Sequence, residues 1–464
     1  MRKPRSVFSA FLGLILMLAA CSPATFSPPH QMHLAPGDHM IRPKIAIDAS
    51  GVSHITGIVN NRVIYYRTVL GQPSLGLTMT MTGTGTNWRQ FDPDIAVTDS
   101  GTAYLVWTEL RGGAFKTACY QVIPPTPPAG GYPTGCRQLD PVDFSQGNTK
   151  VVSTGEYVYA LYDRANSTGK VDSLWFKDLV TPGGTGTIYS YTDNSEEGYL
   201  YSWDAAVDRE GYLHVGYLDN DGVGVSPFHD RLRYCSNRSL WAGTMNQCWF
   251  ISSTNDLEGD VPVSLTLGDT SGEQYVILAS VTDIAAIDEI RLASCSTAGC
   301  NFQSYLTVPL PSAWGSTSVI KDVEVNGNGN ELALAWIGNN GTTSFDQVYV
   351  KHAPMAAHEP SSPSADRGTY KMGLESASVA HRPGYIFIGQ YRVFAWAETG
   401  LSSVQYYSDD GDHQHMVYAQ NCLSSPPNGE IASHGIHLAG VWEACGESYF
   451  SAQAYLTRMP VIRR

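Results

Sequence analysis

Short apolar runs, each bounded by glycine, asparagine or aspartate, recur along the chain from about residue 42 onward. Two of them, VIYYR at 63–67 and YLVWTE at 104–109, are rich in the β-branched and aromatic residues that strands favour. No window repeats apolar residues at i, i+3, i+4 and i+7, which is the spacing of an amphipathic helix. The pattern therefore predicts many short strands and little helix.

These runs follow one order that repeats along the chain. The segments 42–48, 92–99 and 202–208 match one another, and each leads into a turn that contains a glycine. A second run then ends in an aromatic residue and often an acid, and the aromatic residues Trp107, Tyr162 and Tyr217 are spaced 55 residues apart. Weaker copies bring the number to eight, and they begin near Lys150, Val263, Asp322, Ser378 and Glu430.

Each copy has room for four strands, which predicts a four-stranded antiparallel sheet of the size of a propeller blade. The repeat resembles that of sialidase-like β-propellers, which often reads P-x-I-A-V-D-x-x-G-x-x-Y-x-x-W, and residues 42–48 and 92–107 match it best. The resemblance implies an all-β fold, a β-propeller of about eight four-stranded antiparallel blades. Seven blades, with one weak copy as an insertion, is the alternative.

The last copy ends before its fourth strand, because residues 458–464 alone follow its third. Residues 31–41 precede the first copy and could supply the missing strand. Such closure would remove exposed sheet edges and tie the two ends of the chain together. We therefore expect the propeller to span residues 31–464.

The first residues carry a targeting signal. Basic residues at positions 2, 3 and 5 precede an apolar run over 11–20, which is too short to span a membrane. The sequence LAAC, ending at Cys21, resembles the lipobox of bacterial lipoproteins. That resemblance implies a signal peptide at 1–20, two or three acyl chains on Cys21, a tether at 21–30, and attachment to a membrane outside the cytoplasm. An ordinary cleaved secretory signal is the alternative.

Cysteine spacing predicts disulfides. The chain has nine cysteines, and eight remain when Cys21 is set aside. They fall into neighbouring pairs, and three of the pairs flank turns, where a hairpin would bring the two thiols together. The fourth would join the end of one repeat to the middle of the next. Disulfides persist outside the cytosol, which agrees with an extracytoplasmic protein. The expected pairs are Cys119–Cys136, Cys235–Cys248, Cys295–Cys300 and Cys422–Cys445.

The negative net charge of the protein argues against a nucleic-acid partner. The formal net charge is −14, and no cluster of lysine and arginine offsets it. Such a surface repels phosphate backbones, so we expect no nucleic-acid partner.

Acidic residues recur where inner strands begin and where second strands end. In a propeller, both places open on one face around the channel, so these acids predict a mostly acidic ring with a few lysines. The ring could bind a glycan or protein that presents hydroxyls or cations, or its acids could cap backbone N–H groups at strand ends. The candidate binding residues are Asp94, Glu109, Asp163, Asp204, Asp219, Asp322, Glu398 and Glu443.

Two segments raise the question of a metal. DNDG at 219–222 resembles the start of a calcium loop, although no bidentate acid follows at the offset of an EF-hand. Residues 409–415 (DDGDHQH) place two histidines at alternate positions. Ca²⁺ is the one cofactor that the sequence suggests, and a solvated turn explains the same residues in both segments.

No catalytic set is complete, and we assign no catalytic residue. The first-blade arginines Arg42, Arg62 and Arg67 lie outside the F/Y-R-I-P setting of sialidases, and no full Asp-box, G-x-S-x-G or H-E-x-x-H occurs. The first hypothesis is a binding or scaffold propeller at the cell surface. The second is a glycoside hydrolase of the sialidase-like superfamily, for which two carboxylates about 5–10 Å apart would suffice.

The lipid anchor can be tested by replacing its acceptor. Cys21→Ser removes the thiol that would carry the acyl chains, so the protein should move from membranes to the soluble extracytoplasmic fraction while keeping its unfolding midpoint. Fractionation in high salt measures this. If the Cys21→Ser protein stays with the membrane, the anchor lies elsewhere.

Overall fold

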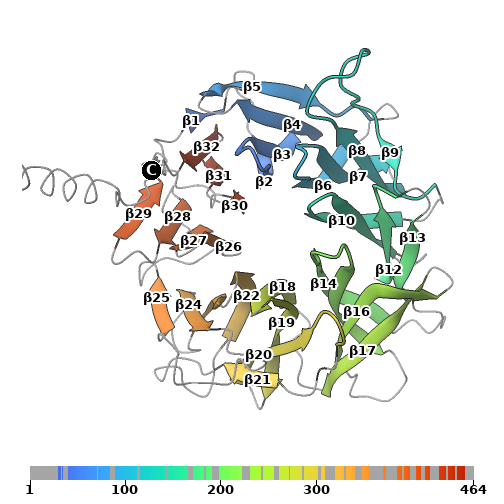
Figure 1. The fold of residues 1–464 in the computed structure, drawn as a ribbon, viewed down its shortest axis with the longest axis vertical. Coiled ribbons are helices and arrows are strands. Elements are labelled where there is room, and N and C mark those ends of the chain that lie inside the picture. Colours follow the sequence, from blue (N-terminus) through green and yellow to red (C-terminus); the bar gives the residue numbers. More distant parts are fainter. Residues whose placement is uncertain are drawn as a thin grey trace, which may run out of the picture.

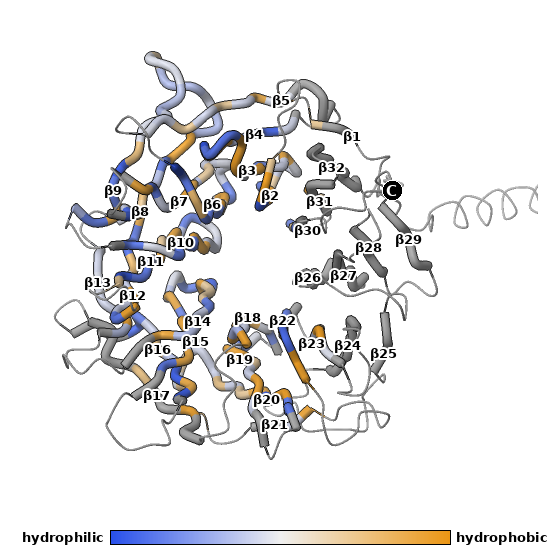
Figure 2. Tube along the Cα trace, turned by 180° about the vertical axis from the view of Figure 1, so that it is seen from behind, coloured by the Kyte–Doolittle hydropathy of each residue, from blue (hydrophilic) through white to orange (hydrophobic). Residues whose placement is uncertain are grey.

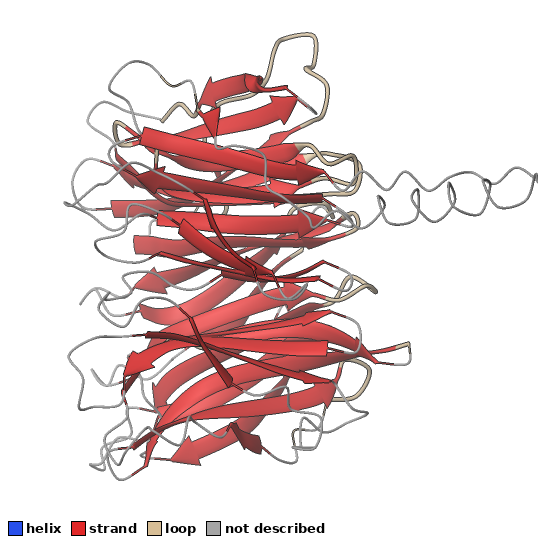
Figure 3. Cartoon of the chain, turned by 90° about the vertical axis from the view of Figure 1, so that its left-hand side faces the viewer, coloured by secondary structure: helices blue, strands red, loops and turns tan. Residues whose placement is uncertain are grey.

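The computed structural model describes the following residues of the protein: 30–32, 34, 40–69, 72–83, 89–111, 115–141, 145–165, 171–181, 184–190, 198–221, 230–241, 244–254, 261–270, 272–284, 287–300, 302, 305–308, 319–328, 331–339, 347–354, 369–372, 384–388, 391–397, 404–408, 413–417, 428–434, 437–444 and 447–454. The regular elements within these segments are strands, as Figure 3 shows. The same segments contain no helix of the length and hydrophobicity that crossing a bilayer would need.

The strands form sheets set in a ring (Figure 1). The innermost strands are β2 (Ile41–Ile47), β6 (Arg89–Val97), β10 (Ser145–Thr154), β14 (Gly198–Val207), β18 (Ser264–Thr270), β22 (Val319–Asn328), β26 (Gly384–Ile388) and β30 (Asn428–His434). The second strands are β3 (Ser53–Val59), β7 (Ala103–Arg111), β11 (Tyr157–Ala165), β15 (Leu213–Asp221), β19 (Glu273–Ile284), β23 (Glu331–Asn339), β27 (Tyr391–Ala397) and β31 (His437–Ala444).

Two further strands complete each sheet toward the rim of the ring. The third strands are β4 (Arg62–Val69), β8 (Phe115–Ile123), β12 (Val171–Asp178), β16 (Asp230–Trp241), β20 (Ile287–Ser296), β24 (Gln347–Pro354), β28 (Val404–Ser408) and β32 (Glu447–Ala454). The outer strands are β5 (Gln72–Thr80), β9 (Arg137–Gln138), β13 (Thr185–Ser190), β17 (Thr244–Thr254), β21 (Tyr305–Val308), β25 (Thr369–Met372), β29 (His413–Val417) and β1 (His30–Gln31).

The order of the strands confirms the prediction of an all-β propeller. Six of the described sheets hold four strands, and one holds eight. Within the eight-stranded sheet, β10–β13 and β14–β17 each keep the order of a separate blade, and one parallel pair, Thr187 with Thr244, joins them. A count of eight blades fits this division, and it stays a prediction beside the alternative of seven.

The two ends of the chain meet in one sheet. Strand β1 pairs antiparallel with β32, with His30 opposite Phe450 and Gln31 opposite Tyr449. Immediately after β1, Met32 packs into the same apolar cluster as Phe450. The prediction that the N-terminal segment supplies the missing fourth strand is thus confirmed, and the strand lies at the very start of that segment.

Apolar side chains fill the space between neighbouring sheets. One cluster joins Ile45 of the first sheet to Val441 of the last. The aromatic residues that recur in the second strands belong to these cores, because Trp107 and Trp336 are fully buried. Figure 2 shows apolar and polar residues interspersed along the coloured strands. The repeat seen in the sequence is therefore a packing repeat.

Glycines in the turns between first and second strands allow the blades to approach one another. Gly51 and Gly211 have φ of +83° and +88°, a conformation that disfavours any residue with a Cβ. A Cβ on Gly51 would lie 2.6 Å from the ring of His437, and one on Gly211 would lie 2.5 Å from the ring of Tyr157. In both cases, the contact comes from the preceding blade.

Three of the expected disulfides are present, namely Cys119–Cys136, Cys235–Cys248 and Cys295–Cys300. The first cysteine of each pair lies on the third strand of its sheet, and the second lies on or just before the outer strand. Each bridge therefore ties the outer strand of a blade to its interior, as predicted. Cys422 and Cys445 lie outside the described residues.

Two glycines form a matched pair that isolates the contact between blades. Gly211 and Gly272 share φ of +88° and +87°, but a Cβ on Gly272 would have no atom within 4 Å. Both alanine variants should lose about 1–2 kcal/mol for the left-handed backbone. Gly211→Ala must also displace the ring of Tyr157, which is 48% exposed, and should lose about 0.5–1.5 kcal/mol more. Urea unfolding compares the two, and equal losses would show that the blades do not depend on this contact.

Candidate functional site

The register of the inner strands defines a set of equivalent positions near the centre of the ring, which we call the ring positions. A ring position is the inner-strand residue that pairs with the residue just before the recurring aromatic position of the second strand. Asp94, for example, pairs with Val106, which precedes Trp107. In the described part of the chain, the ring residues are Lys44, Asp94, Lys150, Asp204, Ser264, Glu324, Gly384 and Glu430.

Side-chain oxygens at the ring positions form hydrogen bonds with the neighbouring blade. Four ring residues accept a hydrogen bond from a backbone N–H on the next inner strand around the ring. The acceptor and donor residues, with their distances, are Asp94 and Val151 (2.9 Å), Asp204 and Leu265 (2.7 Å), Ser264 and Val325 (3.1 Å), and Glu430 and Ile45 (2.9 Å). The last of these joins the final sheet to the first. For Asp94 and Asp204, these are the contacts that the capping interpretation predicts.

Lysines alternate with the acids over part of the ring. Lys44 Nζ lies 3.2 Å from Glu430 Oε1, and Lys150 forms an ion pair with Asp204. Burial raises the pKa of Asp94, whereas Lys44 and Lys150 lower it. From β30 to β14 the ring therefore alternates negative and positive charge, so the acids there do not simply repel one another.

One predicted binding residue, Asp322, does not occupy a ring position. Asp322 follows a register shift in β22, and Glu324, two residues later, occupies the ring position. Asp322 Oδ1 accepts the backbone N–H of Val323 at 3.0 Å. Sequence comparison missed Glu324 because it began that weak copy of the repeat at Asp322, two residues too early, and it missed Ser264 because it considered charged residues alone.

The acid at the end of β15 is surrounded by cations. Asp219 is fully buried, and its two oxygens lie 3.2 Å from Arg231 Nη2 and from Arg233 Nε. Burial raises the pKa of Asp219, and the two arginines lower it. Because its oxygens already face guanidinium groups, Asp219 is poorly placed to begin a calcium loop. Residues 222–229, which would continue that loop, lie outside the described residues.

The acid at the end of β11 has an unusual protonation equilibrium. Asp163 is 3% exposed, and its carboxylate accepts a hydrogen bond from the side-chain amide of Asn148. Burial raises the pKa of Asp163 to about 6, although Asn148 and Lys116 lower it. Asp92 acts in the opposite direction and raises it.

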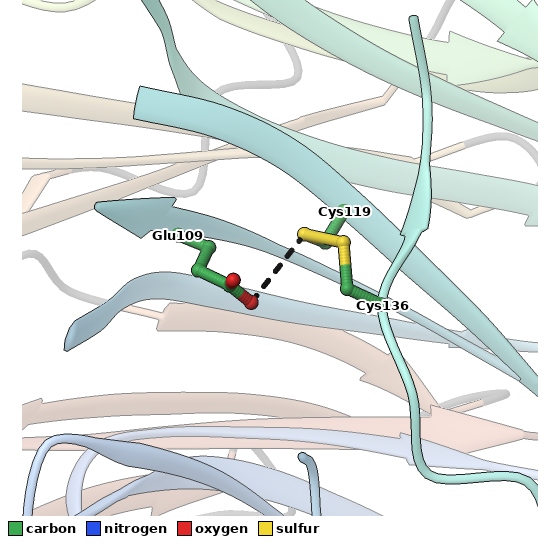
Figure 4. A group of neighbouring side chains, drawn as sticks. All are labelled: Glu109, Cys119 and Cys136. Atoms are coloured by element: carbon green, nitrogen blue, oxygen red, sulfur yellow. Dashed lines mark hydrogen bonds between the residues drawn. A yellow bond between two sulfur atoms is a disulfide. The ribbon is translucent and has the colours of Figure 1, made fainter. Parts of the chain in front are cut away.

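The remaining second-strand acids are Glu109, Glu398 and Glu443, and the side chain is described for Glu109 alone. Glu109 is fully buried on β7, and its Oε2 lies 3.9 Å from Cys119 Sγ, as Figure 4 shows. Glu109, Cys119 and Cys136 have the composition of a metal site. However, the two sulfurs are joined in a disulfide and offer no thiolate to a metal. Glu398 lies outside the described residues, as do 409–412, and of Glu443 the backbone alone is described.

Two buried hydrogen-bonded relays lie near the turns that carry Gly51 and Gly211, and the sequence analysis missed them. His54 lies 2.7 Å from the Tyr65 hydroxyl and 3.3 Å from Asp48 Oδ2. A second relay repeats this arrangement with Asp208, His214 and Tyr234. The signal was present, because D-x-x-G-x-x-H occurs at 48–54 and again at 208–214.

These relays are structural in their present arrangement. His54 and Tyr65 are at most 1% exposed, so neither reaches a molecule in solvent. Burial lowers the pKa of His54, although the hydrogen bond and the charge of Asp48 raise it. Burial raises the pKa of Asp48, but hydrogen bonds from His54, Ser50 and the Val52 N–H outweigh it and bring the value below the usual range.

A pocket of about 460 Å³ lies between the β14–β17 half of the eight-stranded sheet and the β18–β21 sheet, beside the turns that carry Gly211 and Gly272. Its wall includes Arg209 and Arg238, whose guanidinium groups lie 3.0 and 3.9 Å from the Glu210 carboxylate. None of the eight candidate acids lines it.

No family model matches the chain, and no curated protein matches it. Solved structures with a similar fold include the polysaccharide lyase Uly1, at 8% identity over 94% of this chain and 93% of that one, with a TM-score of 0.47. The Dos1 propeller is 10% identical over 92% and 95% of the two chains, with a TM-score of 0.47. Extracellular domains 1–2 of Drosophila Semaphorin 1b are 9% identical over 93% and 87%, with a TM-score of 0.40.

The raised pKa of Asp163 predicts a pH dependence of stability. Below its ordinary value of 3.8 the carboxyl is protonated in the folded and the unfolded chain alike. Between pH 3.8 and about 6 the folded state holds a proton that the unfolded state has already lost, so the stability of the wild type falls as pH rises through this range. Asp163→Asn should therefore gain stability relative to the wild type between pH 4 and pH 7, by up to about 3 kcal/mol.

Denaturation midpoints at both pH values measure this gain. Asp99→Asn, at an exposed turn, is the control and should show no comparable change. A stability difference for Asp163→Asn that is the same at pH 4 and pH 7 would contradict the assignment.

Proposed function

We propose that the protein is a lipid-anchored, extracytoplasmic β-propeller that binds a glycan or a protein at the cell surface. The observation that favours binding over catalysis is that the acids near the centre of the ring serve the architecture. Asp94, Asp204 and Glu430 hold neighbouring blades together through backbone N–H groups, and Asp219 is enclosed by two arginines. Carboxylates engaged in this way are poorly suited to proton transfer to a substrate, because a proton would break the contacts that they stabilise.

The location outside the cytoplasm is supported by the disulfides. Three bridges lie on the outer strands of three blades, and such bonds persist in oxidising compartments. Membrane attachment through Cys21 rests on the sequence of the signal. Strand β1 begins nine residues after Cys21, so the proposed tether would be short.

A glycoside hydrolase is the second candidate, and one observation favours it. Asp163 is buried with a pKa raised to about 6, which suits a general acid, and the charge of Asp92 contributes to that shift. Two carboxyl groups in different environments are the minimum that glycoside hydrolysis needs.

One experiment separates the two candidates. The full mature protein, extracted in detergent, is applied to a printed array of neutral and acidic oligosaccharides and to intact cells with a crosslinker. Mass spectrometry then tests each bound oligosaccharide for cleavage. We expect retention of an oligosaccharide or a surface protein without cleavage. Cleavage that Asp163→Asn abolishes would overturn the proposal in favour of the hydrolase, and the absence of any bound partner would refute it outright.

A further inference from the structure

Three neighbouring inner strands carry the same distortion. In β2, β6 and β10, two residues are skipped in the pairing with the second strand, which is a β-bulge. The first residue of each bulge has a left-handed backbone, with φ of +51° at Arg42, +46° at Asp92 and +41° at Asn148. We call these three residues the bulge triad.

A left-handed backbone is unfavourable for residues with a side chain, and glycine would relieve the cost. The turns between first and second strands use glycine in this conformation, as at Gly51 and Gly211. At the bulges, the chain instead keeps an arginine, an aspartate and an asparagine. Aspartate and asparagine enter this region more readily than other residues with a side chain, so the cost is largest at Arg42. Strain that persists in this way is typical of residues held for binding or catalysis.

The triad presents complementary hydrogen-bonding groups. The side chain of Arg42 is 60% exposed and forms an ion pair with Asp92, which is 33% exposed. Asn148 is exposed, and its amide reaches the carboxylate of Asp163. Strand β6 lies between β2 and β10 and contacts both, so the three residues belong to adjoining blades near the centre of the ring (Figure 1).

We propose that Arg42, Asp92 and Asn148 form a subsite for the hydroxyl groups of a glycan. Each hydroxyl both donates and accepts a hydrogen bond, and the triad supplies donors in the guanidinium and amide groups and acceptors in the carboxylate. The charges of Arg42 and Asp92 cancel, which favours an uncharged polyhydroxyl ligand over an ion. The inference rests on the proposed binding function and specifies its ligand and its place.

Glycine variants test the subsite without weakening the fold. Arg42→Gly and Asp92→Gly remove the side chain and relieve the backbone, so unfolding midpoints should stay the same or rise. Binding to the oligosaccharide that the wild-type protein retains on the array should fall at least tenfold. Asn61→Gly is the matched control, because Asn61 has φ of +63° in the turn between β3 and β4, outside the triad. It should likewise keep or raise the midpoint, with binding unchanged.

The outcomes separate this inference from the function on which it rests. Wild-type binding to an oligosaccharide that both triad variants retain at full strength would refute the subsite and leave the binding function standing. If the wild-type protein binds a surface protein but no oligosaccharide, the subsite is refuted and the binding function stands. A lower midpoint with unchanged binding would show that the triad serves the architecture. Loss of binding in Asn61→Gly as well would refute the specific role of the triad.

Discussion

The propeller depends on hydrogen bonds that run from the side chain of one inner strand to the backbone of the next. The inner strands have one edge toward the centre of the ring, and neighbouring inner strands contact one another there. A carboxylate that accepts a backbone N–H across this junction forms a charge-assisted bond, which is stronger than a bond between neutral groups. Asp94, Asp204 and Glu430 each make such a bond, and Glu430 makes it across the point where the last sheet meets the first. Together with the pairing of β1 and β32, this contact closes the ring.

The same constraint explains why the acids recur. A repeat that needs an acceptor at one place in each blade keeps an acid or a hydroxyl there, as Ser264 shows beside Asp204. Lysines at the corresponding positions of β2 and β10 then neutralise neighbouring acids. The recurrence of acids around a channel is thus no evidence of a binding site by itself. Polar side chains that are held against an unfavourable backbone, as in the bulge triad, point to binding more directly.

Much of the architecture could be predicted from the sequence, because strand order, core aromatics and disulfides all follow from local spacing. Trp107 and Trp336 stand out as a repeated apolar position, and Cys235 and Cys248 flank a single hairpin turn. The ring could be predicted in part, since Asp94 and Asp204 lie in the best-matched copies. Glu324 could not, because its weak copy of the repeat offers acids at both 322 and 324, and spacing alone does not choose between them. The bulge triad was also hidden, since a left-handed backbone at Arg42 or Asp92 leaves no mark on residue type.

Asp204→Ala tests most directly the division between ring residues that stabilise the fold and the proposed binding at the bulge triad. The change leaves the N–H groups of Ala205 and Leu265, and the ammonium of Lys150, without their acceptor. We predict a loss of about 2–4 kcal/mol in the free energy of unfolding in urea, with the affinity for the array-identified oligosaccharide unchanged. Unchanged stability together with a loss of affinity would contradict the account and place Asp204 in the binding site.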